Sequence, residues 1–235
     1  MDLTLITLLF LNNFILSAVV QEISFTGDSH KYCVCFVDMV DSTKITATLD
    51  PEEMKRYYSI FINVMAAIAR DNEANVIKST GDSLIFYFPK TSDSSYQPAF
   101  DDVLECGLVM LEVDPIINEK LTTEGLPVLH YRISADYGRV DLANSLTSTG
   151  EDIFGPTVNI CAKINPFASP NSMVIGYGLY RIVKRFFGNE EYAFKRIGDY
   201  SIEDLGLRYP IFSVVNKAKN NNNRIETIKM YKDIF

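Results

Sequence analysis

The sequence is poor in the residues that build zinc sites and disulfide frameworks. Its 235 residues include only 4 cysteines and 2 histidines. The two closest cysteines, Cys33 and Cys35, lie in the apolar run CVCFV rather than in a loop with metal-ligand spacing. No second pair of Cys or His matches them, so the spacing argues against a zinc site or a disulfide-stapled fold. We expect all four cysteines to be buried, reduced thiols of a cytosolic protein.

Basic residues are also in short supply. The chain has 22 Lys and Arg against 30 Asp and Glu, which gives a formal net charge of -8. A nucleic-acid-binding surface requires basic side chains clustered on one face, and this balance argues against one. We therefore expect small molecules or proteins as partners, and no nucleic acid.

Long hydrophobic runs are scarce, and one segment alone approaches the thickness of a bilayer core. This segment is LTLITLLFLNNFILSAVV, residues 3–20. Asn12 and Asn13 lie at its centre, and no Lys or Arg precedes it. Three interpretations stay open: a membrane anchor, an amphipathic helix docked on the protein, and a partly ordered leader. In each of them the remainder of the chain is expected in the cytoplasm.

Hydrophobic periodicity predicts alternating strands and helices after this leader. KYCVCFVDM (31–39) is rich in β-favouring residues and ends in polar DSTK, which is typical of a buried strand. Asp50 followed by Pro51 predicts the start of a helix that continues to about Arg70. ANVIKS and SLIFYF then form two short strands around a glycine turn. A second helix of about twenty residues ending before Pro127, followed by the strand LHYRISADY, completes the pattern.

This order of elements predicts an α+β fold. Strand, helix, two strands, helix and strand form a ferredoxin-like βαββαβ sheet with helices on one face, and later apolar runs append further C-terminal elements. We expect a hydrophobic leader over 1–29 and a globular domain over 30–216. Residues 217–235 begin with the polar stretch KAKNNNNR, which predicts a linker followed by a terminal helix.

Two carboxylates lie directly beside apolar strands. Asp38 follows CVCFV, and Asp82 lies in the turn before SLIFYF. A carboxylate buried beside such strands is costly without a cation. If the two strands are neighbours, both side chains converge on one point and can hold divalent metal ions that bind nucleotide phosphates. Taken singly, Asp38 is better explained as a cap of the next segment and Asp82 as a turn residue.

Four segments resemble the signature motifs of class III adenylyl and guanylyl cyclases. FVDMVDST resembles FxDIVGST, and IKSTGDSLIFYF resembles VKTxGDxxxxxF. YRISADYGRV is similar to RxGxxxGxV, and DIFGPTVNICAKI to DxxGxxVNxAxRL. The resemblance runs in the family's order from about Lys31 to Val215. It implies that residues 30–216 form a cyclase catalytic domain that converts ATP to cyclic AMP and pyrophosphate, as a homodimer with shared active sites.

The resemblance also implies a role for individual residues. By this resemblance Asp38, Met39 and Asp82 would bind two Mg²⁺ or Mn²⁺ ions, Val40, Asp41, Ser42 and Thr43 would surround the phosphates, Lys78 and Asp152 would select adenine, Asn159 would orient the ribose, and Lys163 would stabilise the transition state. Deprotonation of the ribose 3′ hydroxyl is then assigned to the metal, because no histidine falls within the motifs.

The chain departs from the family pattern at three positions. Lys163 replaces an arginine, Asp41 replaces a glycine, and Leu205 stands where many members have a lysine that contacts the triphosphate. Arg208 is expected to supply that contact instead. These departures leave a second hypothesis open, a cyclase-like module that binds nucleotide without turnover. A diguanylate cyclase, a third hypothesis, lacks its GGDEF-like segment here.

Overall fold

The computed structural model describes residues 23–79, 81–145, 151–187, 191–202, 206–217 and Tyr231. Its strands are β1 (Ile23–Met39), β2 (Asn75–Ser79), β3 (Ser83–Phe88), β4 (Tyr131–Ser145), β5 (Glu151–Phe154), β6 (Ser172–Gly176), β7 (Tyr192–Ile202) and β8 (Leu207–Asn216). Its α-helices are α2 (Ser42–Thr46), α3 (Pro51–Asp71), α4 (Gln97–Glu112), α5 (Asp114–Thr123), α6 (Pro156–Ile164) and α7 (Tyr177–Phe186), with 3-10 turns η1 (Pro89–Ser92) and η2 (Asn165–Phe167).

One mixed sheet organises the fold. Its strand order is β2-β3-β1-β4-β6-β8-β7, and β5 pairs with β4. The pairing of β4 with β6 is parallel, whereas the other pairings are antiparallel. The predicted α+β class with a βαββαβ core and appended C-terminal elements is therefore confirmed.

The longer helices pack against one face of this sheet. The main core joins buried side chains of α3, α4, α5 and α7 to every second residue of the central strands, such as Cys35, Val37 and Ile133. The N-terminus of α3 forms as predicted: Asp50 accepts hydrogen bonds from the N–H groups of Glu52 and Glu53, and the Glu53 side chain accepts one from the Asp50 N–H. Such a capping box stabilises a helix by about 1 kcal/mol.

The appended helix α6 covers the other face of the sheet. Cys161 of α6 packs there with Tyr32, Val34 and Leu142, whose side chains alternate with those of the main core. All four cysteines of the chain are buried, as predicted. Because α6 occupies this second face, side chains at the end of β1 that point away from the main core lie on the same side of the sheet as α6.

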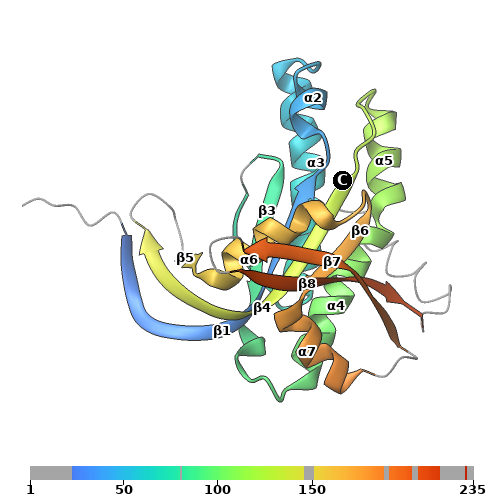
Figure 1. Cartoon of the computed structure of the whole chain (residues 1–235). Coiled ribbons are helices and arrows are strands. Elements are labelled where there is room, and N and C mark those ends of the chain that lie inside the picture. The colour runs from blue at the N-terminus through green and yellow to red at the C-terminus, as the bar shows by residue number, and fades with distance from the viewer. Residues whose placement is uncertain are drawn as a thin grey trace, which may run out of the picture.

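Several boundaries differ from the sequence prediction. The predicted second helix is two helices separated at Val113, because Pro115 has no N–H group with which to continue the hydrogen bonding of α4. Strand β1 begins at Ile23 and extends back across the predicted boundary between leader and domain at residue 30. Its first residues pair with the end of β4, and the two strands curve away from the helices as an arm, together with β5 (Figure 1).

Some sequence predictions fall outside the described residues. They include the hydrophobic segment 3–20 and, apart from Lys217 and Tyr231, the predicted linker and terminal helix. Among the described residues, no helix has the length and hydrophobicity that a bilayer crossing requires.

Candidate active site

The two predicted metal-binding carboxylates lie side by side. Asp38 is near the end of β1, and its register partner on β3 is Ser83, the residue after Asp82. The Met39 N–H donates to the Asp82 carbonyl (3.0 Å), and this hydrogen bond joins the end of β1 to the turn before β3. The Ser42 hydroxyl, buried at the start of α2, donates to Asp82 Oδ2 (2.5 Å) and orients that carboxylate. Neighbouring strands therefore bring together residues more than forty positions apart.

The charge distribution at this point favours a cation. Burial and, next, the negative charge of Asp82 raise the pKa of Asp38 to about 6, while Arg132 acts in the opposite direction. A bound divalent ion would offset the repulsion between the carboxylates. Among the described residues, no cluster of three or more His, Cys, Asp or Glu side chains could hold a metal. Two carboxylates and a backbone carbonyl suit Mg²⁺, which keeps several water ligands and binds substrate phosphates.

Arg132 also belongs to this site. It is the register partner of Asp38 on β4. Its Nε atom is buried and has no hydrogen-bond partner among the described residues. An unpaired buried donor beside the Asp38–Asp82 pair fits an anion such as a phosphate oxygen. Strand register, which the sequence does not display, is what places this arginine here.

The segment that follows β1 has the geometry of a phosphate-binding turn. Asp41 adopts a left-handed conformation (φ 56°), which explains why the resembling motif has glycine at this position. Among the described residues, the N–H groups of residues 41–43 donate to no backbone carbonyl. The Val40 N–H differs, because it donates to the His130 carbonyl (2.7 Å) and is not free to bind phosphate. Lys44 pairs with Asp41 (2.7 Å) and compensates its charge.

The two predicted base-selecting residues form an ion pair. Lys78 Nζ lies 2.9 Å and 3.1 Å from the two carboxylate oxygens of Asp152. Asp152 Oδ1 also accepts the Ile153 N–H (2.9 Å), which holds the carboxylate in place on β5. The two side chains are 45% and 20% exposed, so their polar edge remains accessible to a ligand. The curved arm is what brings β5 to β2.

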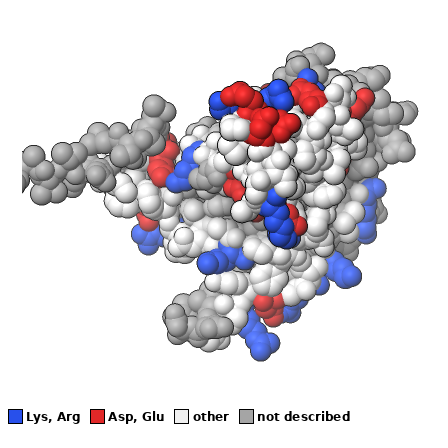
Figure 2. All heavy atoms as spheres, turned by 90° about the horizontal axis from the view of Figure 1, so that it is seen from above, with Lys and Arg blue, Asp and Glu red and all other residues white. Residues whose placement is uncertain are grey.

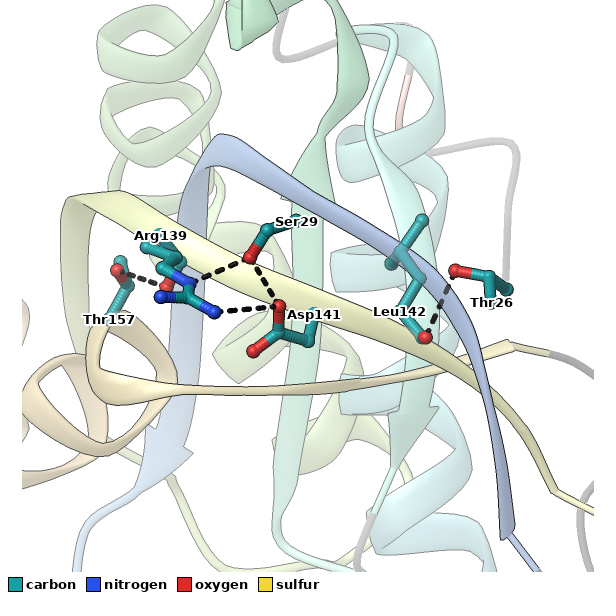
Figure 3. Close-up of polar contacts among 6 residues, drawn as sticks. All are labelled: Thr26, Ser29, Arg139, Asp141, Leu142 and Thr157. Atoms are coloured by element: carbon teal, nitrogen blue, oxygen red, sulfur yellow. Dashed lines mark hydrogen bonds and ion pairs between the residues drawn. The ribbon is translucent and has the colours of Figure 1, made fainter.

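Helix α6 presents the last two predicted catalytic residues. Asn159 and Lys163 lie one turn apart on its exposed side, opposite buried Cys161. Thr157 in its first turn donates to the Arg139 carbonyl (2.8 Å) (Figure 3). Gly155, at φ 128°, precedes the helix where a Cβ atom would lie 3.0 Å from the same carbonyl.

Polar contacts also stabilise the arm formed by β1, β4 and β5, and α6 follows directly after β5. Arg139 donates through Nε to the Ser29 hydroxyl (2.7 Å), and Ser29 bonds Asp141 (Figure 3). Nearer the tip, the Thr26 hydroxyl donates to the Leu142 carbonyl (3.2 Å). Arg139 also forms an ion pair with Asp141, with its Nη2 atom 3.7 Å from Asp141 Oδ1. These contacts fix the curvature that positions β5 and the start of α6.

The structure thus arranges the predicted residues in three groups. The carboxylate pair, the Lys78–Asp152 pair and the exposed side of α6 are not connected by any hydrogen bond or ion pair within the described part of one chain. Arg208 is exposed on β8 and Leu205 lies outside the described residues. On the face shown in Figure 2, basic side chains are interspersed with acidic and uncharged ones.

Comparisons with known proteins identify the family of this chain. The family described as the adenylate and guanylate cyclase catalytic domain matches residues 26–220. An adenylate cyclase of Streptomyces griseus is 25% identical over 142 residues, which are 60% of this chain and 30% of that protein. This chain therefore covers less than a third of that relative's length.

Solved structures share the fold at low sequence identity. The guanylyl cyclase Cya2 superposes with a TM-score of 0.70 at 20% identity, covering 83% of this chain and 97% of that one. The adenylyl cyclase CyaB from P. aeruginosa gives 0.71 at 18% identity, covering 80% and 95%. Both kinds of cyclase are thus equally similar in fold, and the fold does not discriminate ATP from GTP.

Proposed function

Since this chain belongs to the adenylate and guanylate cyclase catalytic domain family, whose members generally use two divalent metal ions, we propose that it converts ATP to cyclic AMP and pyrophosphate. The observation that carries the choice of ATP is the ion pair of Lys78 with Asp152. Family membership supports nucleotide cyclisation, and this pair supports the base.

The donor and acceptor order of the pair suits adenine. Adenine presents an acceptor at N1 and a donor at its exocyclic amine, whereas guanine presents a donor at N1 and an acceptor at its exocyclic oxygen. Lys78 offers only donors and ionised Asp152 only acceptors. With Lys78 toward N1 and Asp152 toward the exocyclic group, both side chains can hydrogen-bond adenine. Guanine would place its N1 donor against the Lys78 donor and its exocyclic acceptor against the Asp152 acceptor.

The carboxylate pair performs the phosphate chemistry in this proposal. Asp38, Asp82 and the Met39 carbonyl would hold the ions, which when bound neutralise phosphate charge and lower the pKa of the ribose 3′ hydroxyl. Ser42 keeps Asp82 oriented through its 2.5 Å hydrogen bond. The buried Nε of Arg132 donates to a phosphate oxygen, and the free N–H groups of residues 41–43 hold the remaining phosphates.

A second copy of the chain would complete the site. Asn159 and Lys163 lie on the exposed side of α6 and make no contact with the carboxylate pair of the same chain. A two-fold dimer would place α6 and the Lys78–Asp152 pair of one subunit against the carboxylates of the other. Asn159 would then orient the ribose, and the Lys163 ammonium would meet charge that develops on the α-phosphate.

One observation favours a second candidate, a nucleotide-binding module with little turnover. Lys163 keeps the positive charge but lacks the planar donor fork of an arginine. The intact carboxylate pair and the unpaired Arg132 donor favour the enzyme.

The test is to incubate the full chain with ATP or GTP and Mg²⁺ or Mn²⁺ and to quantify cyclic nucleotide. We expect cyclic AMP from ATP, a much lower rate with GTP, and loss of product in Asp38→Asn. Formation of cyclic GMP from GTP faster than cyclic AMP from ATP would refute the assignment of ATP. Nucleotide binding without either product would support the second candidate.

A further inference from the structure

A cavity on the face of the sheet that packs against α7 plays no part in the proposed cyclisation. It measures about 410 Å³ and is walled by β1, β4, α7 and the segment after η1. This size is within the range of small-molecule sites. Its lining residues are Lys31, Ser94, Tyr137, Gly138, Gly178, Arg181, Ile182 and Arg185. In Figure 1, α7 lies at the lower end of the molecule, beside the bend where β1 and β4 enter the arm.

Three cations line this cavity, and no described acid neutralises them. Lys31, Arg181 and Arg185 form no ion pair with any carboxylate of the described residues. Each arginine instead lies over a ring of its own helix, with its Cζ 5.8 Å from the centroid of Tyr177 or Phe186. Such stacking leaves the guanidinium N–H groups free to donate. This concentration of unpaired positive charge occurs in a chain of net charge -8.

Helix stability does not account for this arrangement. Arg185 in the last turn of α7 complements the helix dipole. Arg181 is one turn earlier, and like charges at this spacing repel each other. Lys31 comes from a different element and adds a third positive charge to the same cavity. Asp93 also faces Tyr137, but it accepts hydrogen bonds from the N–H and hydroxyl of Ser95 rather than from a cation.

The uncharged lining adds hydrogen-bonding groups. Ser94 and Tyr137 contribute hydroxyl groups to the lining, and burial raises the pKa of Tyr137, which keeps this phenol neutral. Two hydroxyls beside three cations are the groups that bind the oxygens of a phosphate. The aromatic body of Tyr137 leaves room for an organic part of the ligand against the wall.

The geometry points to a binding site for a small phosphate-bearing molecule of two or more negative charges, separate from the active site. Lys31 precedes Asp38 by seven residues on β1, which places the two sites roughly 20 Å apart along the strand. On β4, Tyr137 of the cavity follows Arg132 of the active site by five residues, roughly 15 Å along the strand. The cavity therefore requires its own ligand and cannot share the substrate bound at the carboxylates.

This site is tested by titrating the full chain with pyrophosphate in a buffer that contains a chelator, so that no free divalent ion is present. Isothermal calorimetry should detect binding that weakens as salt is added. Arg181→Gln and Arg185→Gln should each raise the Kd by about tenfold or more, because each removes charge-assisted hydrogen bonds. The matched control is Lys184→Gln, which removes one charge from the same helix outside the cavity lining and should leave the Kd within about twofold.

The outcomes separate this site from the active site and from a surface effect. If pyrophosphate bound only at the active site, its Kd would not change in Arg181→Gln or Arg185→Gln. An unchanged Kd in both variants therefore overturns the proposal, and so does absence of binding by the native chain. Equal weakening in Lys184→Gln would indicate general charge attraction and also overturn it. The proposal is also overturned if the native chain fails to bind pyrophosphate but sediments with phosphatidylserine vesicles, and if Arg181→Gln and Arg185→Gln abolish that sedimentation. Melting curves without ligand confirm that each variant is folded.

Discussion

Exchange of the base-selecting pair should invert nucleotide preference while leaving stability almost unchanged. The perturbation is Lys78→Glu combined with Asp152→Cys, which replaces a donor by an acceptor and removes an acceptor. The native pair is partly exposed, at 45% and 20%. Ion pairs of this kind contribute only about 0.2–1 kcal/mol to folding. The unfolding free energy of the double variant should therefore fall by about 1 kcal/mol or less.

The effect on nucleotide choice should be much larger. A hydrogen bond to a charged group contributes about 1.5–3 kcal/mol, and the double variant loses two such bonds to adenine. We expect the ratio of kcat/KM for ATP over GTP to fall by at least about a hundredfold. Initial rates of cyclic AMP and cyclic GMP formation measure this ratio, and urea unfolding measures stability. A variant that still turns over ATP with an unchanged ratio would refute base selection by this pair.

Three further predictions concern single residues. Asp41→Gly should raise the melting temperature by about 2–4 °C, because glycine adopts the left-handed conformation (φ 56°) without strain; no rise would argue against strain there. Burial raises the pKa of Asp136 to about 6, so its ionisation costs about 3 kcal/mol. The unfolding free energy should therefore fall as pH rises from about 4 to 6, and Asp136→Asn should reduce this slope in urea titrations; an identical slope would contradict the raised pKa. Lys163→Arg should raise kcat by about tenfold with little change in KM, whereas a lower kcat would contradict the assignment of Lys163 to transition-state stabilisation.

The core of the fold was predictable because its signals are local. The apolar stripe of α3, its Asp50 cap and the alternating residues of β1 and β3 are each contained in a short window of sequence. The carboxylates of Asp38 and Asp82 were recognisable because each adjoins such a strand. In both cases the pattern and the packing in the structure depend on the same neighbours.

The remainder depends on contacts between distant segments. The polar stretch at the start of β1 has no strand periodicity, and it is extended because β4 pairs with it. A nine-residue amphipathic helix such as α6 shows which side is buried but not which face of the sheet it covers. Arg132 joins the site through strand register, and Lys78 meets Asp152 across 74 residues of chain.

Mixing two variants tests the central claim, a shared active site that cyclises ATP, most directly. Asp38→Ala lacks a metal ligand and Lys163→Ala lacks the transition-state cation, so each alone should form almost no cyclic AMP. Mixed in equal amounts, half of the dimers should contain both chains, each with one intact site out of two, which gives about a quarter of native activity. If subunit exchange is demonstrated and the mixture forms no more cyclic AMP than the separate variants, the shared site is contradicted.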